Sequence, residues 1–130
     1  MEKEYTVRPY QFGDEDGILK LLELVFDGWP RYDIGCSSLD HWKWKYLDNP
    51  SRKNFIILGV SGDQVIGVNH AIHLRIKIGE KTLPCAYVAD TGVHPDFRRM
   101  GVLNRMRELK RTDVTDEDVT LNFFVSSSPI

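Results

Sequence analysis

The sequence predicts one α/β domain of the α+β type, with a mixed, mostly antiparallel central sheet flanked by helices. Its 130 residues fit a single domain, and 42% hydrophobic with 28% charged residues is the composition of an ordinary globular protein. In some segments apolar residues recur with a helical period. In others, apolar and polar residues alternate or apolar residues form a continuous run, as is typical of strands. Turn residues separate these segments into the order β-α-α-β-β-β-α-β.

The first half of the chain combines one strand with two helices. Residues 5–9 alternate enough to form a strand. Asp14 is expected to be the N-cap of a helix whose apolar residues recur at helical spacing over 18–26. A turn-rich loop follows, and Ser38 is expected to cap a short aromatic helix that runs to residue 46.

The second half is mainly β. Three apolar, β-rich runs at 55–60, 64–78 and 82–93 are separated by glycine turns and predict antiparallel strands. Helical spacing resumes from Leu103, and 119–126 is a last β-rich run. The final strand-helix-strand connection is expected to be a right-handed crossover.

The printed sequence stops at Ile130, directly after the predicted last strand. A sheet that ends there has an exposed edge, which proteins normally cover or pair. We therefore expect a single domain over 1–130 that is truncated after its fifth strand, or one whose edge is covered by a partner such as a second copy in a homodimer.

Charge and cysteine content restrict the partners. A formal net charge of −2 supplies no global basic field for nucleic acid, so any anion site must be local. No secretory signal and no run of about 20 apolar residues is present, which argues against a membrane partner. Cys36 and Cys85 form neither a CxxC pair nor a disulfide framework, so a reducing, cytoplasmic setting is expected.

One turn has the chemistry of a phosphate site. Arg98-Arg99-Met100-Gly101-Val102 lies between the strand at 82–93 and the next helix. Helix N-termini offer unpaired amides and a favourable dipole, glycine permits close backbone approach, and arginines add charged contacts to phosphate oxygens. For such a short motif alone, an ordinary helix start with solvated arginines is the competing interpretation.

In this context the chain resembles the GCN5-related N-acetyltransferase (GNAT) family, most specifically over residues 90–102. The family pattern is Gln/Arg-x-x-Gly-x-Gly/Ala, so Arg98 and Gly101 match, while Leu103 replaces the last small residue. The resemblance implies acetyl-CoA as donor substrate. It implies pantetheine pairing with the backbone of Thr91, Gly92 and Val93, and pyrophosphate binding by Arg98, Arg99, Met100, Gly101, Val102, Leu103 and Asn104.

Two residues of the strand at 82–93 are candidate catalytic groups. In the resembled family the base, where there is one, often projects from this strand, at about the position of Tyr87. Asp90 is the only carboxylate in the strand at 82–93. Asp90 could instead brace the following turn. Strict alternation places Tyr87 and Asp90 on opposite faces unless a bulge intervenes. The family's acid is often a tyrosine beyond the fifth strand, past the end of this sequence.

Aromatic and histidine residues complete the candidate set. Trp29 and Tyr32 lie in the loop and are acceptor-site candidates, whereas Trp42 and Tyr46 share a helical face and are expected to pack on the sheet. His70 and His73 point to opposite faces of a strand, and no histidine forms a metal-ligand pattern, so we expect no metal.

The leading functional hypothesis is transfer of an acetyl or other acyl group from coenzyme A to a primary amine, by direct attack in a ternary complex. The alternative is a non-catalytic acyl-CoA-binding or regulatory module, because base and acid are unassigned. The acceptor, a small molecule or a peptide, cannot be read from the sequence.

Overall fold

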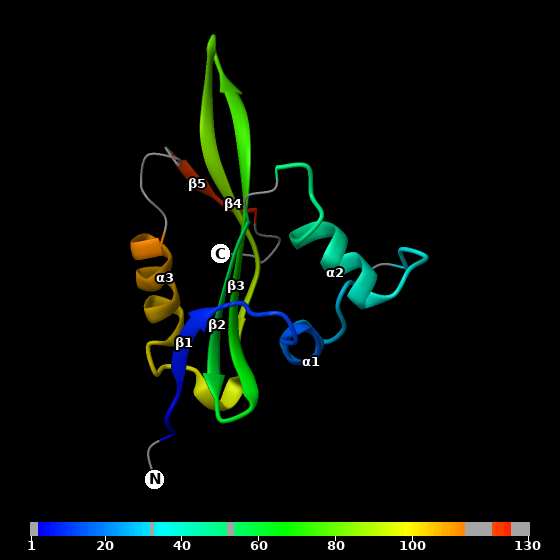
Figure 1. Cartoon of the computed structure of the whole chain (residues 1–130), viewed down its shortest axis with the longest axis vertical. Helices are drawn as coiled ribbons and strands as arrows, with labels where there is room; N and C mark the ends of the chain where they lie inside the picture. Colours follow the sequence, from blue (N-terminus) through cyan, green and yellow to red (C-terminus); the bar gives the residue numbers. More distant parts are fainter. Residues whose placement is uncertain (1–2, 32, 52–53, 114–120, 126–130) are drawn as a thin grey trace.

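A computed structural model describes residues 3–31, 33–51, 54–113 and 121–125, with the backbone alone at 111–113. A five-stranded sheet has α1 and α2 on one face and α3 on the other (Figure 1). The elements are β1 (Thr6–Pro9), α1 (Glu15–Phe26), α2 (Ser38–Tyr46), β2 (Asn54–Ser61), β3 (Gln64–Ile78), β4 (Lys81–Val93), the 3-10 helix η1 (Pro95–Phe97), α3 (Val102–Asp113) and β5 (Leu121–Phe123).

The predicted order of strands and helices is confirmed. The strands lie in the order β1-β2-β3-β4-β5, with antiparallel pairs except for parallel β4 and β5. The long β3–β4 hairpin extends well beyond the helices (Figure 1). Of the β-rich run predicted at 119–126, residues 119, 120 and 126 lie outside the described residues, and the described strand is shorter.

Two predicted caps differ from the structure. Asp14 is at the N-cap position of α1, but its carboxylate makes no capping bond; instead it accepts hydrogen bonds from Nη1 and Nη2 of Arg8, at 2.7 and 2.8 Å. Ser37, rather than Ser38, caps α2 by accepting the amide of Asp40 at 3.0 Å. The hydroxyl of Ser38 donates to the carbonyl of Trp29 at 3.1 Å, so it ties the preceding loop to α2.

Two cores lie on opposite faces of the sheet. The larger packs α1 and α2 against β2 and β3, and the smaller packs α3 against the other face. Gly59 and Gly67 lie beneath the first residue of α3: a Cβ on Gly67 would stand 2.9 Å from the Val102 side chain, and one on Gly59 3.0 Å. These glycines let the start of α3 approach the sheet closely, beside the end of β4.

Strand β4 contains a bulge at Asp90. Val68 pairs with Gly92 and His70 with Ala89, so two residues of β4 face one residue of β3. Asp90 takes a left-handed conformation with φ 47°. A bulge was the stated exception to placing Tyr87 and Asp90 on opposite faces, and the extra residue reverses the alternation and turns both side chains toward α2.

Candidate active site

The turn singled out in the sequence forms the wall of a hollow. Arg99 and Gly101 have positive φ, 63° and 77°, and α3 begins immediately afterwards. The hollow has a volume of about 250 Å³. Every predicted coenzyme-binding residue except Thr91, Gly92 and Met100 lines it; its lining is Val93, Phe97, Arg98, Arg99, Gly101, Val102, Leu103 and Asn104. The first amides of α3, which lack intrahelical acceptors, lie at this hollow.

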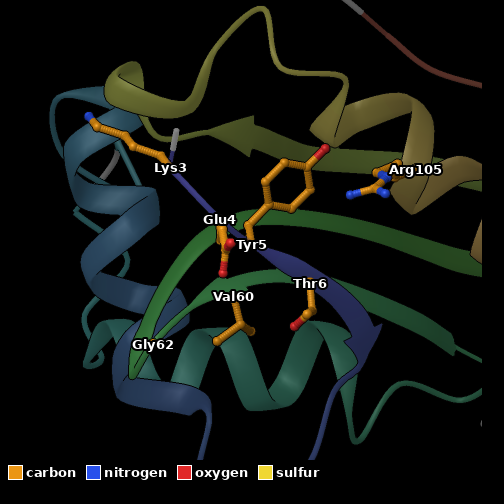
Figure 2. Close-up of a pocket in the computed structure, with 7 residues that line it drawn as sticks. All are labelled: Lys3, Glu4, Tyr5, Thr6, Val60, Gly62 and Arg105. Atoms are coloured by element: carbon orange, nitrogen blue, oxygen red, sulfur yellow. The ribbon is translucent and has the colours of Figure 1, made fainter. Parts of the chain in front are cut away.

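The turn is held from both sides. Arg98 Nε donates to the Val93 carbonyl at 3.2 Å, and the Tyr5 hydroxyl donates to the Met100 carbonyl at 2.8 Å. Figure 2 shows Tyr5 in a second hollow of about 470 Å³, with Arg105 beside its ring at 5.2 Å. From the sequence, Tyr5 was expected only as a strand residue. Its contact with Met100 joins residues 95 positions apart, which no local pattern signals.

The edge of β4 beside this turn is open. Pairing with β5 ends at Tyr87, and from Val88 to Val93 β4 has no strand on that side within the described ranges. Thr91 turns its hydroxyl to Asn69 Oδ1 at 3.0 Å, toward β3. Gly92 lies beneath α1, where a Cβ would stand 2.8 Å from Val25. The free edge offers backbone donors and acceptors to an extended ligand.

A polar network surrounds Asp90 on the α2 face. Trp29 Nε1 donates to Oδ1 at 2.9 Å, Lys45 Nζ forms an ion pair with Oδ2 at 2.8 Å, and the Tyr46 hydroxyl also donates to Oδ2. Burial alone would raise the pKa of Asp90, but the bonds from Lys45 and Tyr46 outweigh it and hold this pKa below its usual range. Burial and the Asp90 charge raise the pKa of Tyr46, which therefore stays protonated.

His70 supports the bulge from within the core. Its Nε2 accepts from Trp42 Nε1 at 3.0 Å, and burial lowers its pKa to about 4, so the imidazole is neutral at pH 7. The remaining proton belongs on Nδ1, which lies 2.9 Å from the Asp90 carbonyl and donates to it. The ring stacks on Tyr46 with centroids 3.9 Å apart. The imidazole thus fixes the carbonyl of the bulge residue.

The other predicted site residues have mixed placements. Trp29 is only 8% exposed, and it reaches the site through its indole nitrogen. Tyr32 lies outside the described residues. Tyr87 stacks on Phe123 of β5, with centroids 5.2 Å apart. Trp42 and Tyr46 pack together as predicted, at 6.1 Å.

Histidine placement follows the predicted faces. His73 lies beside Phe55 on the face opposite His70. In the described part of the chain, no group of three or more His, Cys, Asp or Glu is placed to hold a metal ion. The same part contains no helix long and apolar enough to cross a bilayer.

The contribution of α2 to the polar network was not predicted from the sequence. Lys45 reaches Asp90 across 45 positions, and His41 lies one helical turn before Lys45. The i, i+4 spacing of His41 and Lys45 was a usable signal, because it places both side chains on one face of the predicted helix.

In this α+β domain, a strand edge without a described partner leads to an exposed helix N-terminus. That arrangement is suited to an extended, phosphate-bearing ligand. A family model described as an acetyltransferase (GNAT) domain matches residues 6–130. The chain therefore belongs to the GNAT family of acyl-CoA-dependent N-acetyltransferases. A comparison with curated protein sequences found no match.

Solved structures share the fold. An aminoglycoside acetyltransferase from an uncultured soil metagenomic sample, in complex with trehalose, matches with a TM-score of 0.69 and 18% identity, over 95% of this chain and 78% of that one. An aminoglycoside 6′-N-acetyltransferase from Acinetobacter baumannii gives 0.71 and 17%, over 95% and 80%. An acetyltransferase from Vibrio fischeri gives 0.68 and 18%, over 92% and 93%. These similarities establish the fold, and the family match establishes the class of enzyme.

Proposed function

We propose that this protein transfers the acetyl group of acetyl-CoA to a primary amine, by direct attack of the amine on the thioester in a ternary complex. The observation that carries the proposal is the continuity between two features: the free edge of β4 from Val88 to Val93, and the hollow at the start of α3. Family membership supplies the reaction type.

The donor is proposed to lie along this path. The pyrophosphate binds at residues 98–104, where helix amides and the exposed Arg99 supply donors and positive charge. The pantetheine pairs with the open backbone of Thr91, Gly92 and Val93. This direction brings the thioester toward the bulge, with Asp90 and Tyr87 on the α2 face. Leu103 packs against the α3 core and also lines the hollow, so a larger residue is accommodated there.

The acceptor is proposed to be a small-molecule or peptide amine that binds on the α2 face, near Trp29, Asp90 and Tyr87. Two of the structural neighbours are aminoglycoside acetyltransferases, which supports a small-molecule amine. A reducing, cytoplasmic setting is also proposed, because Cys36 and Cys85 are both free thiols.

Thiol release from acetyl-CoA, followed against a panel of aminoglycosides, polyamines, amino acids and peptides, tests this function. We expect at least one primary amine to accelerate release and to yield the N-acetyl product by mass spectrometry. Tight binding of acetyl-CoA with no acceleration by any acceptor would contradict enzymatic transfer. That result would favour an acyl-CoA-binding module instead.

A further inference from the structure

His41 lies beside the polar network without belonging to it. Its ring centroid lies 5.3 Å from that of Trp29 and 5.9 Å from that of Trp44, on which the ring stacks. Trp29 bonds Asp90 through its indole nitrogen, and Lys45, one turn along α2, bonds the other carboxylate oxygen. His41 is therefore placed next to the Lys45–Asp90 ion pair, on the face where the proposed function puts the acceptor.

Transfer to an amine requires a base, because an alkylammonium has a pKa near 10 and cannot attack while protonated. Three other titratable groups at the bulge, Asp90, Tyr46 and His70, are already engaged in hydrogen bonds. Asp90 accepts three hydrogen bonds, which leaves it weakly basic. The Tyr46 hydroxyl keeps its proton and donates it in a hydrogen bond to Asp90. Both ring nitrogens of His70 take part in hydrogen bonds.

Unlike these groups, His41 has ring nitrogens that are available to accept a proton. Among the residues that the structure describes, neither of its ring nitrogens has a hydrogen-bond partner, and its contacts are the two tryptophan rings. The charged groups that act on the ring are Lys45 from its own helix and Asp90 from β4; the loop side presents the uncharged Trp29. Burial and Lys45 lower the pKa of His41, against an opposing effect of Asp90, so the ring is neutral at pH 7.

We propose that His41 is the catalytic base that takes the first proton from the acceptor ammonium. This inference rests on the proposed function. The neutral imidazole accepts one proton and becomes imidazolium, and the freed amine attacks the thioester carbonyl carbon. A C–N bond forms and the C–S bond breaks. The second nitrogen proton goes to the departing thiolate, giving the amide and free CoA thiol, and imidazolium then releases its proton to solvent.

The test compares the wild-type enzyme with His41→Phe and His41→Gln, using an amine identified in the panel. Phenylalanine keeps an aromatic ring between Trp29 and Trp44 but cannot take a proton. We expect both substitutions to lower kcat at pH 7 by about 100-fold or more, with acetyl-CoA affinity unchanged. Lys43→Gln, on the same helix but outside the network, is the matched control and should keep wild-type turnover.

The pH profile of kcat distinguishes a chemical from a structural role. The wild-type profile should rise through a pKa below about 6.5, the ordinary histidine value, and then level off. The His41→Phe profile should lack this limb and keep rising toward the pKa of the bound amine. An unchanged profile and rate in His41→Phe would overturn the role of His41 while leaving the transferase function intact. A wild-type protein that acetylates no amine would instead contradict the proposed function, and this inference with it.

Discussion

At the scale of single residues, Asp90 is the centre of the candidate site. It is a non-glycine residue in the left-handed region, which aspartate tolerates better than most residues. From the sequence, Asp90 could be catalytic or could brace the following turn. The three donors on its carboxylate are Trp29, Lys45 and Tyr46, so the carboxylate holds the loop and α2 rather than the following turn. Its proposed contribution to transfer is to fix the α2 face rather than to carry protons.

Replacing Asp90 with asparagine should lower the free energy of unfolding by about 1–3 kcal/mol at pH 7, because the Lys45 ammonium loses its partly buried partner. The carboxylate has a lowered pKa in the folded state, so its contribution is complete above the ordinary value of 3.8 and is lost as pH falls through the lowered pKa. Urea titrations should therefore show a difference between wild type and Asp90→Asn that vanishes in acid. The exposed Asp48→Asn is the control, and an equal effect there would contradict the assignment.

His70 should make folding stability pH-dependent in a different window. An unfolded chain protonates this histidine near pH 6.5, whereas the folded chain does so only at about 4. Protonation between these values favours the unfolded state, so stability should fall as pH drops from 6.5 to 4. The contribution is on the order of 3 kcal/mol. His70→Gln should flatten this slope in urea titrations across the window; an unchanged slope would show that His70 is not the responsible group.

At the scale of elements, the segment from β4 to α3 forms the proposed binding site for the donor. The position of α3 depends on the two glycines beneath Val102. Within the described residues, β5 pairs with β4 only as far as Tyr87, which leaves the following edge of β4 without a strand partner there. These two features bring a free strand edge and a helix N-terminus together.

Gly67→Ala tests this arrangement. The added Cβ would stand 2.9 Å from Val102, so α3 must shift away from the sheet. We expect a stability loss of about 1–3 kcal/mol together with weaker acetyl-CoA binding, measured by calorimetry. Gly17→Ala is the matched control, because its Cβ would collide with Val65 at 2.7 Å on the other face. That variant should keep its acetyl-CoA affinity, and parallel losses in the two variants would contradict the link to α3.

Sequence periodicity predicted the elements well, because each helix or strand has its own local pattern. Gln64 to Ile78 was delimited as observed, and the turn at 98–101 was placed at the start of a helix. The bulge at Asp90 was not predictable, since it depends on how β4 pairs with β3. The bond between Lys45 and Asp90 arises from packing of α2 against the sheet, which local patterns do not encode.

At the scale of the whole molecule, β4 lies between the proposed binding site for the donor and the proposed binding site for the acceptor. One end of β4 leads toward the start of α3 (Figure 1), where the hollow lies. The bulge turns the side chains of Asp90 and Tyr87 toward α2 on the other face of the sheet. A donor that lies along the β4 edge would present its thioester where both regions meet. Transfer by this route therefore requires first that acetyl-CoA occupy that edge.

A calorimetric titration of the folded protein with acetyl-CoA tests this claim most directly, with Arg99→Gln as the informative variant and the exposed Arg75→Gln of β3 as its control. We expect saturable 1:1 binding that Arg99→Gln weakens by about 3- to 10-fold, through loss of a charged contact to phosphate, while Arg75→Gln leaves it unchanged. Absence of binding to the folded wild-type protein, or equal weakening by both substitutions, would contradict it.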